Sequence, residues 1–470
     1  MKSKIFIPAL IVLITLGITS CSKWAQDKSN IYKAVEQPGK TVSNSAPLSG
    51  SVKGTMLSGN TYTIDSDIYV NDGDTLMIQP GVTLNFRNGS GLVVLGSLFS
   101  EGTQAAPIYM TVLGVTKNNT PGLSLTQDSA HIGLWRGLIG GTNCPFMVLK
   151  WTHIDFAGNA EGNTISALKE VNQSSGTSYN LLFQNVNGYF IMEDSWVYGG
   201  TDDCTRISCG KIHVFRNTYE KCGGSGGDCV NVKGGTVGTM AYNFFIGTAY
   251  NGQKASNKGQ AVGAPQTDIV MYNSTFVNDG AQVVPGQRGS TIDFEQGAAG
   301  AFYNNVAVNC QVGYRVVNNP VADTTNLVYG YNYQYADSID VADQFFTFGP
   351  VCTIPQPTDL PLPSSYLPAG WVYESPNQNS YSGTAALQKL APEFVNYPLP
   401  GPSGYYPWQV NAIGSYNFHI LPTSPLIGKG YTAVQPLVVV PVDPVYGATE
   451  VTPPGADLGC YQSNGKGNQH

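Results

Sequence analysis

A short run of residues recurs along the middle of the chain and constrains the fold more than any other feature. Each run places an asparagine or aspartate beside aromatic and apolar residues, as in residues 215–219 (FRNTY). Successive markers lie 23, 26, 30, 31 and 28 residues apart, at Asp194, Asn217, Asn243, Asn273, Asn304 and Asn332. Self-similarity at such a period indicates a repeat architecture in which each unit contacts its neighbours.

The length of the period indicates which repeat this is. Three short strands and their turns fit a step of this size, whereas a β-propeller blade needs roughly 40 residues or more. A leucine-rich repeat would show a regular leucine ladder, which is absent. We therefore expect an all-β, single-stranded parallel β-helix in which stacked asparagines form a structural amide ladder between coils.

The start of the body has the same character. Residues 64–95 contain runs of four to six strand-forming residues, separated by turns such as 71–74 (NDGD) and 79–81 (QPG). No helical pattern lies between these runs, which excludes a Rossmann-like alternation of strands and helices. The 55 glycines also favour a turn-rich β protein.

The N-terminus reads as an export signal. Lys2 and Lys4 precede an apolar stretch over 5–18, and residues 18–21 (ITSC) resemble a bacterial lipobox. The stretch is short for a transmembrane helix, which needs about 20 residues. We expect a lipoprotein signal peptide at 1–20, acyl chains on Cys21 and a flexible tether over 21–45; an ordinary signal peptide with an incidental cysteine is the alternative.

Charge argues against nucleic acid as a partner. The formal charge is −7, and it becomes −9 when the signal is removed with Lys2 and Lys4. Only 12% of residues are charged, and the sequence has no stripe of basic residues that could follow a phosphate backbone. The expected partners are a membrane, through the lipid anchor, and a polysaccharide or an outer-membrane protein.

Several segments resemble known β-helix proteins. Residues 75–86, 91–98 and 107–111 look like the opening coils of pectin-lyase-like proteins, and 135–138 and 149–158 continue this pattern. The closing segments of many bacterial surface β-helix proteins are similar to four stretches near the end of the chain: 392–396, 417–420, 424–430 and 456–461. With the lipobox, the chain resembles outer-membrane lipoproteins of Bacteroidetes-type bacteria. The resemblance implies a right-handed helix over 46–344, but not one activity, since this superfamily hosts lyases, hydrolases and adhesins.

The last part of the chain differs in composition. Nineteen of the 29 prolines lie from Pro350 onward. Because proline cannot donate to a strand ladder, it avoids central strands. We therefore expect residues 345–470 to form an irregular, ordered extension that packs along the helix or caps it.

Carboxylates gather after two of the predicted coils. The markers place Asp202, Asp203 and Asp228 in loops that leave comparable strands on adjacent coils. No cofactor is required by any motif, but stacked carboxylates could hold Ca²⁺ there. Arg206 or Lys233 could then stabilise a uronate or abstract its proton.

The activity of this cluster stays open. Residues 227–235 are similar to a polygalacturonase motif that carries paired aspartates, but Gly227 stands in place of one aspartate and no Gly-His-Gly occurs. Acidic turn residues on a soluble solenoid are the alternative interpretation. Asp293 and Glu295 alternate with apolar residues, so both point the same way, either as an acid pair at glycosidase-like spacing or as part of an outward polar face.

A tyrosine-rich stretch is a second candidate site. Period-two spacing predicts that Tyr329, Tyr331, Tyr333 and Tyr335 share one face of a strand. Amphipathic rings are good platforms for sugars or proteins. The alternative is that the proline-rich extension covers this face.

Eight cysteines remain beyond Cys21, and export favours disulfides among them. We expect Cys204–Cys229 and Cys209–Cys222, because the markers put Cys204 and Cys229 on neighbouring coils. Adjacent strands lie about 4.8 Å apart, within the reach of a disulfide. No paired CxxC units with histidine partners occur, so zinc is not expected.

The leading expectation is an outer-membrane lipoprotein whose β-helix binds a glycan or a protein partner. The alternatives are a carbohydrate-active enzyme, a lyase or glycosidase acting on an acidic polysaccharide, and a structural subunit of an outer-membrane assembly. An open cluster of carboxylates with arginine or lysine would favour the enzyme. An exposed aromatic strip without such a cluster would favour binding.

Overall fold

The structure is a computed structural model that describes residues 40–120, 123–160, 179–224, 226–280, 290–310, 313–316, 320–335, 391–397 and 412–470. These residues lie in one compact unit, 37–470. The expected signal peptide, Cys21, most of the tether and the start of the proline-rich extension fall outside them. In the described part, no helix has the length and apolarity to cross a membrane.

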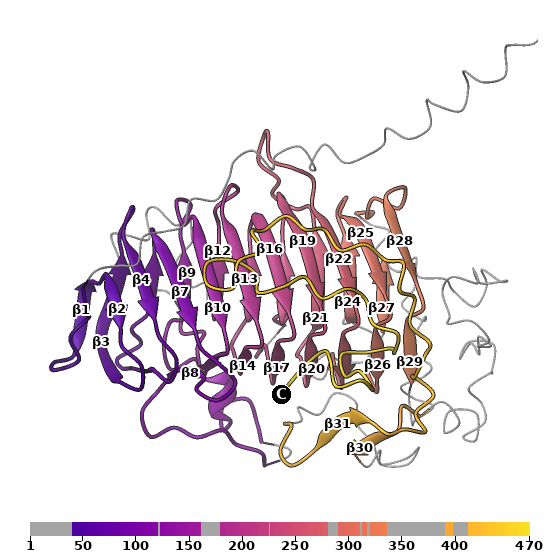
Figure 1. Ribbon diagram of the computed structural model, residues 1–470, viewed down its shortest axis with the longest axis horizontal. Helices are drawn as coiled ribbons and strands as arrows, with labels where there is room; N and C mark the ends of the chain where they lie inside the picture. The colour runs from indigo at the N-terminus through magenta and orange to yellow at the C-terminus, as the bar shows by residue number, and fades with distance from the viewer. Residues whose placement is uncertain are drawn as a thin grey trace, which may run out of the picture. The chain divides into compact units, whose positions relative to one another are not determined.

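The chain forms a right-handed parallel β-helix in which each full coil contributes three strands (Figure 1). Face 1 is one continuous parallel sheet. Its strands are β2 (Gly54–Met56), β4 (Thr75–Ile78), β7 (Ser97–Glu101), β10 (Phe146–Lys150), β13 (Tyr189–Glu193), β16 (Gly210–Phe215), β19 (Thr236–Ala241), β22 (Asp268–Tyr272), β25 (Ala299–Tyr303) and β28 (Leu327–Gly330).

Faces 2 and 3 are joined by the long strand β3 (Thr61–Val70), whose two halves pair with β5 and β6 respectively. Face 2 continues through β5 (Thr83–Phe86), β8 (Ile108–Thr111), β11 (Thr152–Asp155), β14 (Trp196–Tyr198), β17 (Thr218–Glu220), β20 (Phe244–Ile246), β23 (Thr275–Val277), β26 (Val306–Val308) and β29 (Tyr333–Tyr335). Face 3 continues through β6 (Leu92–Val94), β9 (Leu138–Gly140), β12 (Leu181–Phe183), β15 (Thr205–Ile207), β18 (Val230–Val232), β21 (Asn251–Ser256), β24 (Ser290–Glu295) and β27 (Tyr314–Val316).

Strand β1 (Leu48–Ser51) pairs in parallel with β3 and starts the sheet of faces 2 and 3. Outside the three faces, β30 (Phe394–Asn396) pairs antiparallel with β31 (Asn417–Ile420). A short 3-10 helix spans Ser129–His131. The described chain therefore matches the expected all-β solenoid.

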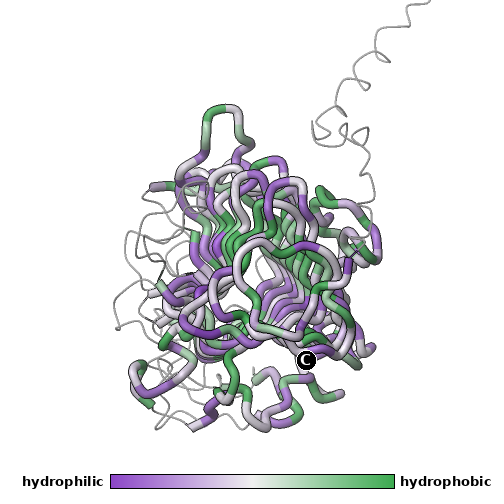
Figure 2. The backbone as a smooth tube through the Cα atoms, turned by 90° about the vertical axis from the view of Figure 1, so that its left-hand side faces the viewer, coloured by the Kyte–Doolittle hydropathy of each residue, from purple (hydrophilic) through white to green (hydrophobic). Residues whose placement is uncertain are grey.

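The interior is a continuous stack of apolar side chains, because alternate residues of each strand point inward. Tyr219, Phe245 and Phe276 stack face to face on successive coils, with 5.0 Å and 4.8 Å between ring centres. Figure 2 shows the coils stacked one behind another in this direction. Burying each such ring contributes roughly 1.5–3 kcal/mol, so the stack is a main source of stability.

The asparagine ladder exists, but its register differs from the expected one. At the corner between faces 1 and 2, Asn217 Oδ1 accepts from the backbone N–H of Ser195, and Asn243 Oδ1 accepts from that of Asn217, both at 3.0 Å. The ladder continues through Ser274, Asn305 and Asn332.

The markers Asp194, Asn273 and Asn304 instead occupy the position before the ladder, with φ of 48°, 50° and 60°. Aspartate and asparagine tolerate this left-handed backbone better than most residues. Because asparagine suits both positions, composition alone could not separate them. The predicted period was correct, and the register was wrong by one residue in these coils.

Residues 412–470 return along the outside of faces 1 and 2 as an irregular segment (Figure 1). Lys150 Nζ donates to the carbonyl of Pro444 at 2.7 Å, and Tyr272 Oη donates to that of Thr452 at 2.6 Å. Phe244 on β20 packs against Phe418, with 4.7 Å between ring centres. The described part of the extension is thus ordered and packs along the helix.

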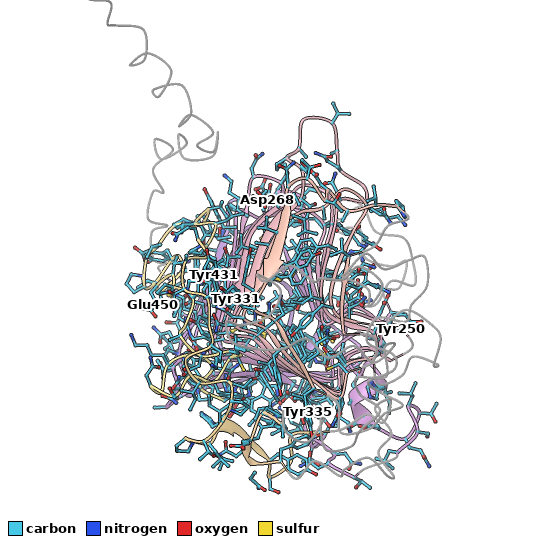
Figure 3. All side chains as sticks on the ribbon, turned by 90° about the vertical axis from the view of Figure 1, so that its right-hand side faces the viewer. Tyr250, Asp268, Tyr331, Tyr335, Tyr431 and Glu450 are labelled. Carbon is cyan, nitrogen blue, oxygen red and sulfur yellow. The ribbon has the colours of Figure 1, made fainter. Side chains whose placement is uncertain are left out.

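The four tyrosines do not form the predicted strip. Tyr329 ends up on β28 and Tyr333 and Tyr335 on β29, while Tyr331 has a φ of 55° at the corner between them. Because the chain turns a corner at Tyr331, the four tyrosines lie on two strands. Period-two spacing therefore does not place them on one face. Tyr333 and Tyr335 are buried, and Tyr331 stacks on Tyr431 of the C-terminal segment at 4.9 Å (Figure 3).

Candidate functional site

Face 3 carries a column of charged and polar side chains that point away from the core and are mostly buried. Register pairing aligns one residue from each of five consecutive coils. The residues next to them along the same strands, such as Val230 and Ile292, point into the core. We call these five residues and the groups bonded to them the charged network; the column is Arg206, Asn231, Lys254, Asp293 and Arg315.

Asp203 anchors one end of the charged network. Its carboxylate accepts from Arg206 Nη1 at 2.7 Å, from Asn231 Nδ2 at 2.9 Å and from the backbone N–H of Asp228 at 2.9 Å. Asp203 and Cys204 directly precede β15, as Asp228 and Cys229 directly precede β18 on the next coil. The side chains of Asp203 and Asp228 therefore lie at the same edge of neighbouring coils. Three donors on one buried carboxylate fix its position.

Asp228 extends the network to the next coils. Its two oxygens accept from Asn231 Nδ2 at 2.8 Å and Asn251 Nδ2 at 2.6 Å. Lys254 Nζ lies 4.0 Å from Asp228, 3.8 Å from Asp293 and 3.2 Å from Glu295. Lys254 therefore links carboxylates from two coils.

The far end holds a two-pronged ion pair. Arg315 donates from Nη2 to Asp293 at 2.6 Å and from Nε at 3.2 Å. Lys233 Nζ lies 3.9 Å from Glu295. Asp293 and Glu295 point the same way from β24, as their alternation with apolar residues predicted, and both approach Lys254.

Burial shifts the proton affinities of two groups in opposite directions. Burial raises the pKa of Asp228 to about 6, with nearby Lys254 opposing this and Asp203 adding to it. Burial lowers the pKa of Lys233 to about 8, helped by Lys254 and Arg206. Burial also raises the pKa of Asp203 and of Asp202. Groups with such shifted pKa values are typical of functional sites.

Solvent reaches this network at its β15 end. The side chain of Arg206 is 23% exposed, whereas that of Asp203 is 5% exposed. The guanidinium carbon lies 5.4 Å from the centre of the Tyr179 ring, and Tyr179 and Asp202 are half-buried. Arg206, Tyr179 and Asp202 form what we call the open end.

Before β15, the outer column consists of apolar and aromatic residues in place of charged ones. In the four preceding coils the same register holds Tyr69, Val93, Ile139 and Leu182. Val93, Ile139 and Leu182 are buried, and Tyr69 packs against them. One continuous column therefore has an apolar half and a charged half.

The structure brings together all five residues that the sequence singled out here. Asp203, Asp228 and Arg206 are bonded or adjacent, and Lys233 joins through Glu295. Asp202 lies at the open end beside Arg206 and Asp228, both of which act on its pKa. Local sequence patterns did not predict Asn231, Lys254 and Arg315; strand register across coils was the signal that could have found them.

Metal binding finds no support in these contacts. Within the described ranges, no group of three or more histidine, cysteine, aspartate or glutamate side chains is arranged to hold a metal ion. The oxygens of Asp203 and Asp228 already accept from amide and guanidinium donors. The Ca²⁺ suggested by stacked carboxylates stays a prediction.

The predicted disulfides are not formed. Cys204 and Cys229 lie on neighbouring coils as expected, since Thr205 pairs with Val230, but both are free thiols. The Cys222 thiol contacts both of them in the interior. Cys209 lies at the opposite end of β15, where its thiol donates to the carbonyl of Gln184 at 2.9 Å, so its predicted pairing with Cys222 is wrong. The three interior thiols pack as small apolar side chains.

Known proteins offer one short similarity. No protein-family model matches the chain, and no solved structure does. The chain is similar to Protein bark beetle of Drosophila melanogaster, with 36% identity over 66 residues, or 14% of this chain. The similar stretch spans 2% of that protein, so the chain covers a small fraction of its length.

Proposed function

We propose that this protein is an exported lipoprotein whose β-helix binds an acidic glycan at the open end of the charged network. The observation that carries this proposal is the setting of Arg206. Asp203 holds its guanidinium at 2.7 Å, yet the group is partly exposed beside the Tyr179 ring.

This setting suits a carboxylated sugar. A guanidinium carries several N–H donors besides the one that Asp203 accepts, and its planar fork matches a carboxylate. An aromatic ring beside it offers a platform for a sugar ring. Because Asp203 is itself fixed by Asn231 and the backbone of Asp228, Arg206 is oriented before a ligand arrives.

The test is affinity electrophoresis through gels that contain polygalacturonate, alginate or a glycosaminoglycan. We expect at least one polymer to retard the protein, and Arg206→Gln to weaken binding about tenfold. Lys211→Gln is the matched control, because Lys211 lies 5.2 Å from the Tyr189 ring on face 1. Equal retardation of wild type and Arg206→Gln would contradict the proposal, as would the absence of binding to all three polymers.

A second candidate is catalysis on the same class of polymer, by a lyase or a glycosidase. It is favoured by the pKa values of Asp228, about 6, and Lys233, about 8, which leave an acid and a base near neutrality in one network. In a lyase, Lys233 as its neutral amine would take the proton next to the uronate carboxylate, and Arg206 would stabilise the charge that develops. The glycosidic C–O bond at the β carbon would break as the double bond forms, and the leaving oxygen would take up a proton.

A lyase forms an unsaturated uronate, which is detected by its new ultraviolet absorbance. The assay compares wild type with Asp228→Ala and Lys233→Ala, with and without Ca²⁺. Product from the wild type that is lost in Lys233→Ala would promote the enzyme. Binding without product would eliminate the lyase, and neither binding nor product would leave a structural subunit of an outer-membrane assembly.

The lipid anchor is part of the same proposal. Its support is the apolar stretch that ends at residues 18–21 (ITSC), with cysteine at the position where lipidation requires it. The mature protein should then fractionate with the outer membrane. If Cys21→Ala leaves the protein equally membrane-bound, the anchor assignment is wrong.

A further inference from the structure

Five rings gather on face 2, whereas the charged network lies on face 3. The His153 ring lies 4.9 Å from Tyr109, 5.7 Å from Trp196 and 5.6 Å from His470, measured between ring centres. Trp151 lies 5.2 Å from His470. We call Tyr109, Trp151, His153, Trp196 and His470 the aromatic cluster.

The cluster follows from strand register and from the return of the C-terminal segment. His153 on β11 pairs with Tyr109 on β8 and with Trp196 on β14, so three rings stack along the outer surface of adjacent coils. His470 reaches the cluster from the far end of the sequence, where its Nε2 lies 2.9 Å from the carbonyl oxygen of Asp194. No sequence spacing could have joined His153 to His470.

Charges around the cluster are paired. Lys117 Nζ lies 4.3 Å from the centre of the Trp196 ring and 3.2 Å from Asp155. Trp196 Nε1 donates to Glu220 at 3.2 Å. Burial and nearby Lys117 lower the pKa of His153 to about 3, so its ring is neutral near pH 7. The rings therefore offer aromatic faces with polar groups at their edges.

Elsewhere on face 2, the C-terminal segment covers the outward-pointing rings. On β20 and β29 the outward Phe244 and Tyr333 are buried in a cluster with residues of the C-terminal segment, such as Phe418. Over the aromatic cluster, Tyr109 is 39% exposed and Trp151, His153, Trp196 and His470 are half-buried. Among the face 2 strands that the structure describes, the aromatic cluster is thus where rings stay accessible.

We propose that the aromatic cluster binds a pyranose unit of a neutral polysaccharide. The apolar C–H face of a pyranose stacks on an aromatic ring, and its hydroxyls match a partly buried polar group such as Lys117, whose side chain is 30% exposed. A cationic ligand is disfavoured because Lys117 already lies over Trp196. The aromatic cluster lies on face 2 and is separate from the open end on face 3. It would bind an uncharged sugar.

The test uses affinity electrophoresis in gels that contain neutral polysaccharides: a xylan, a mixed-linkage β-glucan, a mannan and starch. Tryptophan fluorescence of the full chain, titrated with oligosaccharides of any polymer that retards it, gives the dissociation constant. We expect binding to at least one polymer, weakened about fivefold to tenfold in Tyr109→Ala and in Trp196→Ala. Trp196→Phe, which keeps a ring, should recover most of the affinity.

Matched controls separate this site from the acidic-glycan site. Tyr431→Ala removes a ring of similar exposure, 38%, outside the cluster, and Arg206→Gln alters the open end. Both should bind the neutral polymer like wild type, and melting temperatures exclude unfolding as the cause of any loss. No retardation by the neutral polymers would overturn the proposal, as would equal affinity of wild type and Tyr109→Ala. Retardation by acidic polymers alone would overturn it while leaving the open end standing.

Discussion

The outer column of face 3 offers a comparison within one register. Its apolar half, with Val93, Ile139 and Leu182, and its charged half, from Arg206 to Arg315, lie on consecutive coils of the same sheet. Most side chains in both halves are buried. Burial of the apolar half is favourable, whereas buried charges must recover their lost hydration through partners.

The two halves differ in what the stacking of coils requires. Four coils stack at this position without any charge, so a β-helix of this kind does not need ions there. Stacking of the coils therefore does not explain the charged half, and recognition of a ligand is the explanation that we propose.

Removal of Asp203 should destabilise the protein most. Asp203→Ala leaves Arg206, Asn231 and the backbone N–H of Asp228 without their acceptor. Loss of one partner from a buried ionic group costs about 3–5 kcal/mol in the free energy of unfolding. Chemical denaturation measures this, with the half-buried Asp202→Ala expected within about 1 kcal/mol of wild type. A smaller effect for Asp203→Ala than for Asp202→Ala would refute the role assigned to Asp203.

Truncation in the apolar half should cost somewhat less and respond to different conditions. Ile139→Ala removes buried methylene and methyl groups, for which about 2–4 kcal/mol is expected. The loss should be the same at low and high salt, and at pH 5 and pH 8, because no charge changes. The exposed Val186→Ala serves as the control. A strong salt dependence of the Ile139→Ala effect would blur the distinction between the two halves.

The charged half should impose its own pH dependence. Burial raises the pKa of Asp228 from 3.8 to about 6, so the folded protein binds this proton more tightly than the unfolded chain. The resulting stability is fully present below about pH 4 and is lost as pH rises to about 6, by up to about 3 kcal/mol. Asp228→Asn cannot titrate, so its free energy of unfolding should decline less over this range. If the free energy of unfolding changed with pH in parallel for the two proteins, the pKa of Asp228 would not be shifted in the folded state.

Much of the fold could be predicted from the sequence because period and turn residues report directly on a solenoid. The coil length was confirmed, and Asp293 and Glu295 point the same way from β24, as predicted. The corner position failed for Asn304, because a corner and a ladder accept the same residue type. The tyrosines failed for a related reason, since Tyr331 turns a corner that spacing does not mark.

The candidate site was only partly predictable. Asp203 and Asp228 could be placed together because both follow the repeat. Lys254 and Arg315 needed the register of every intervening coil, which variable loops obscure. His470 joins the aromatic cluster only because the C-terminal segment returns along the helix, a long-range contact that no local pattern encodes.

We propose above that the open end recognises the carboxylates of a glycan. The most direct measurement compares binding of one acidic polysaccharide, such as polygalacturonate, with binding of the same polymer after chemical reduction of its carboxylates. At fixed ionic strength, wild type should bind the acidic form about tenfold more tightly, and Arg206→Gln should lose this preference. Equal affinity of the wild type for both forms would contradict the account.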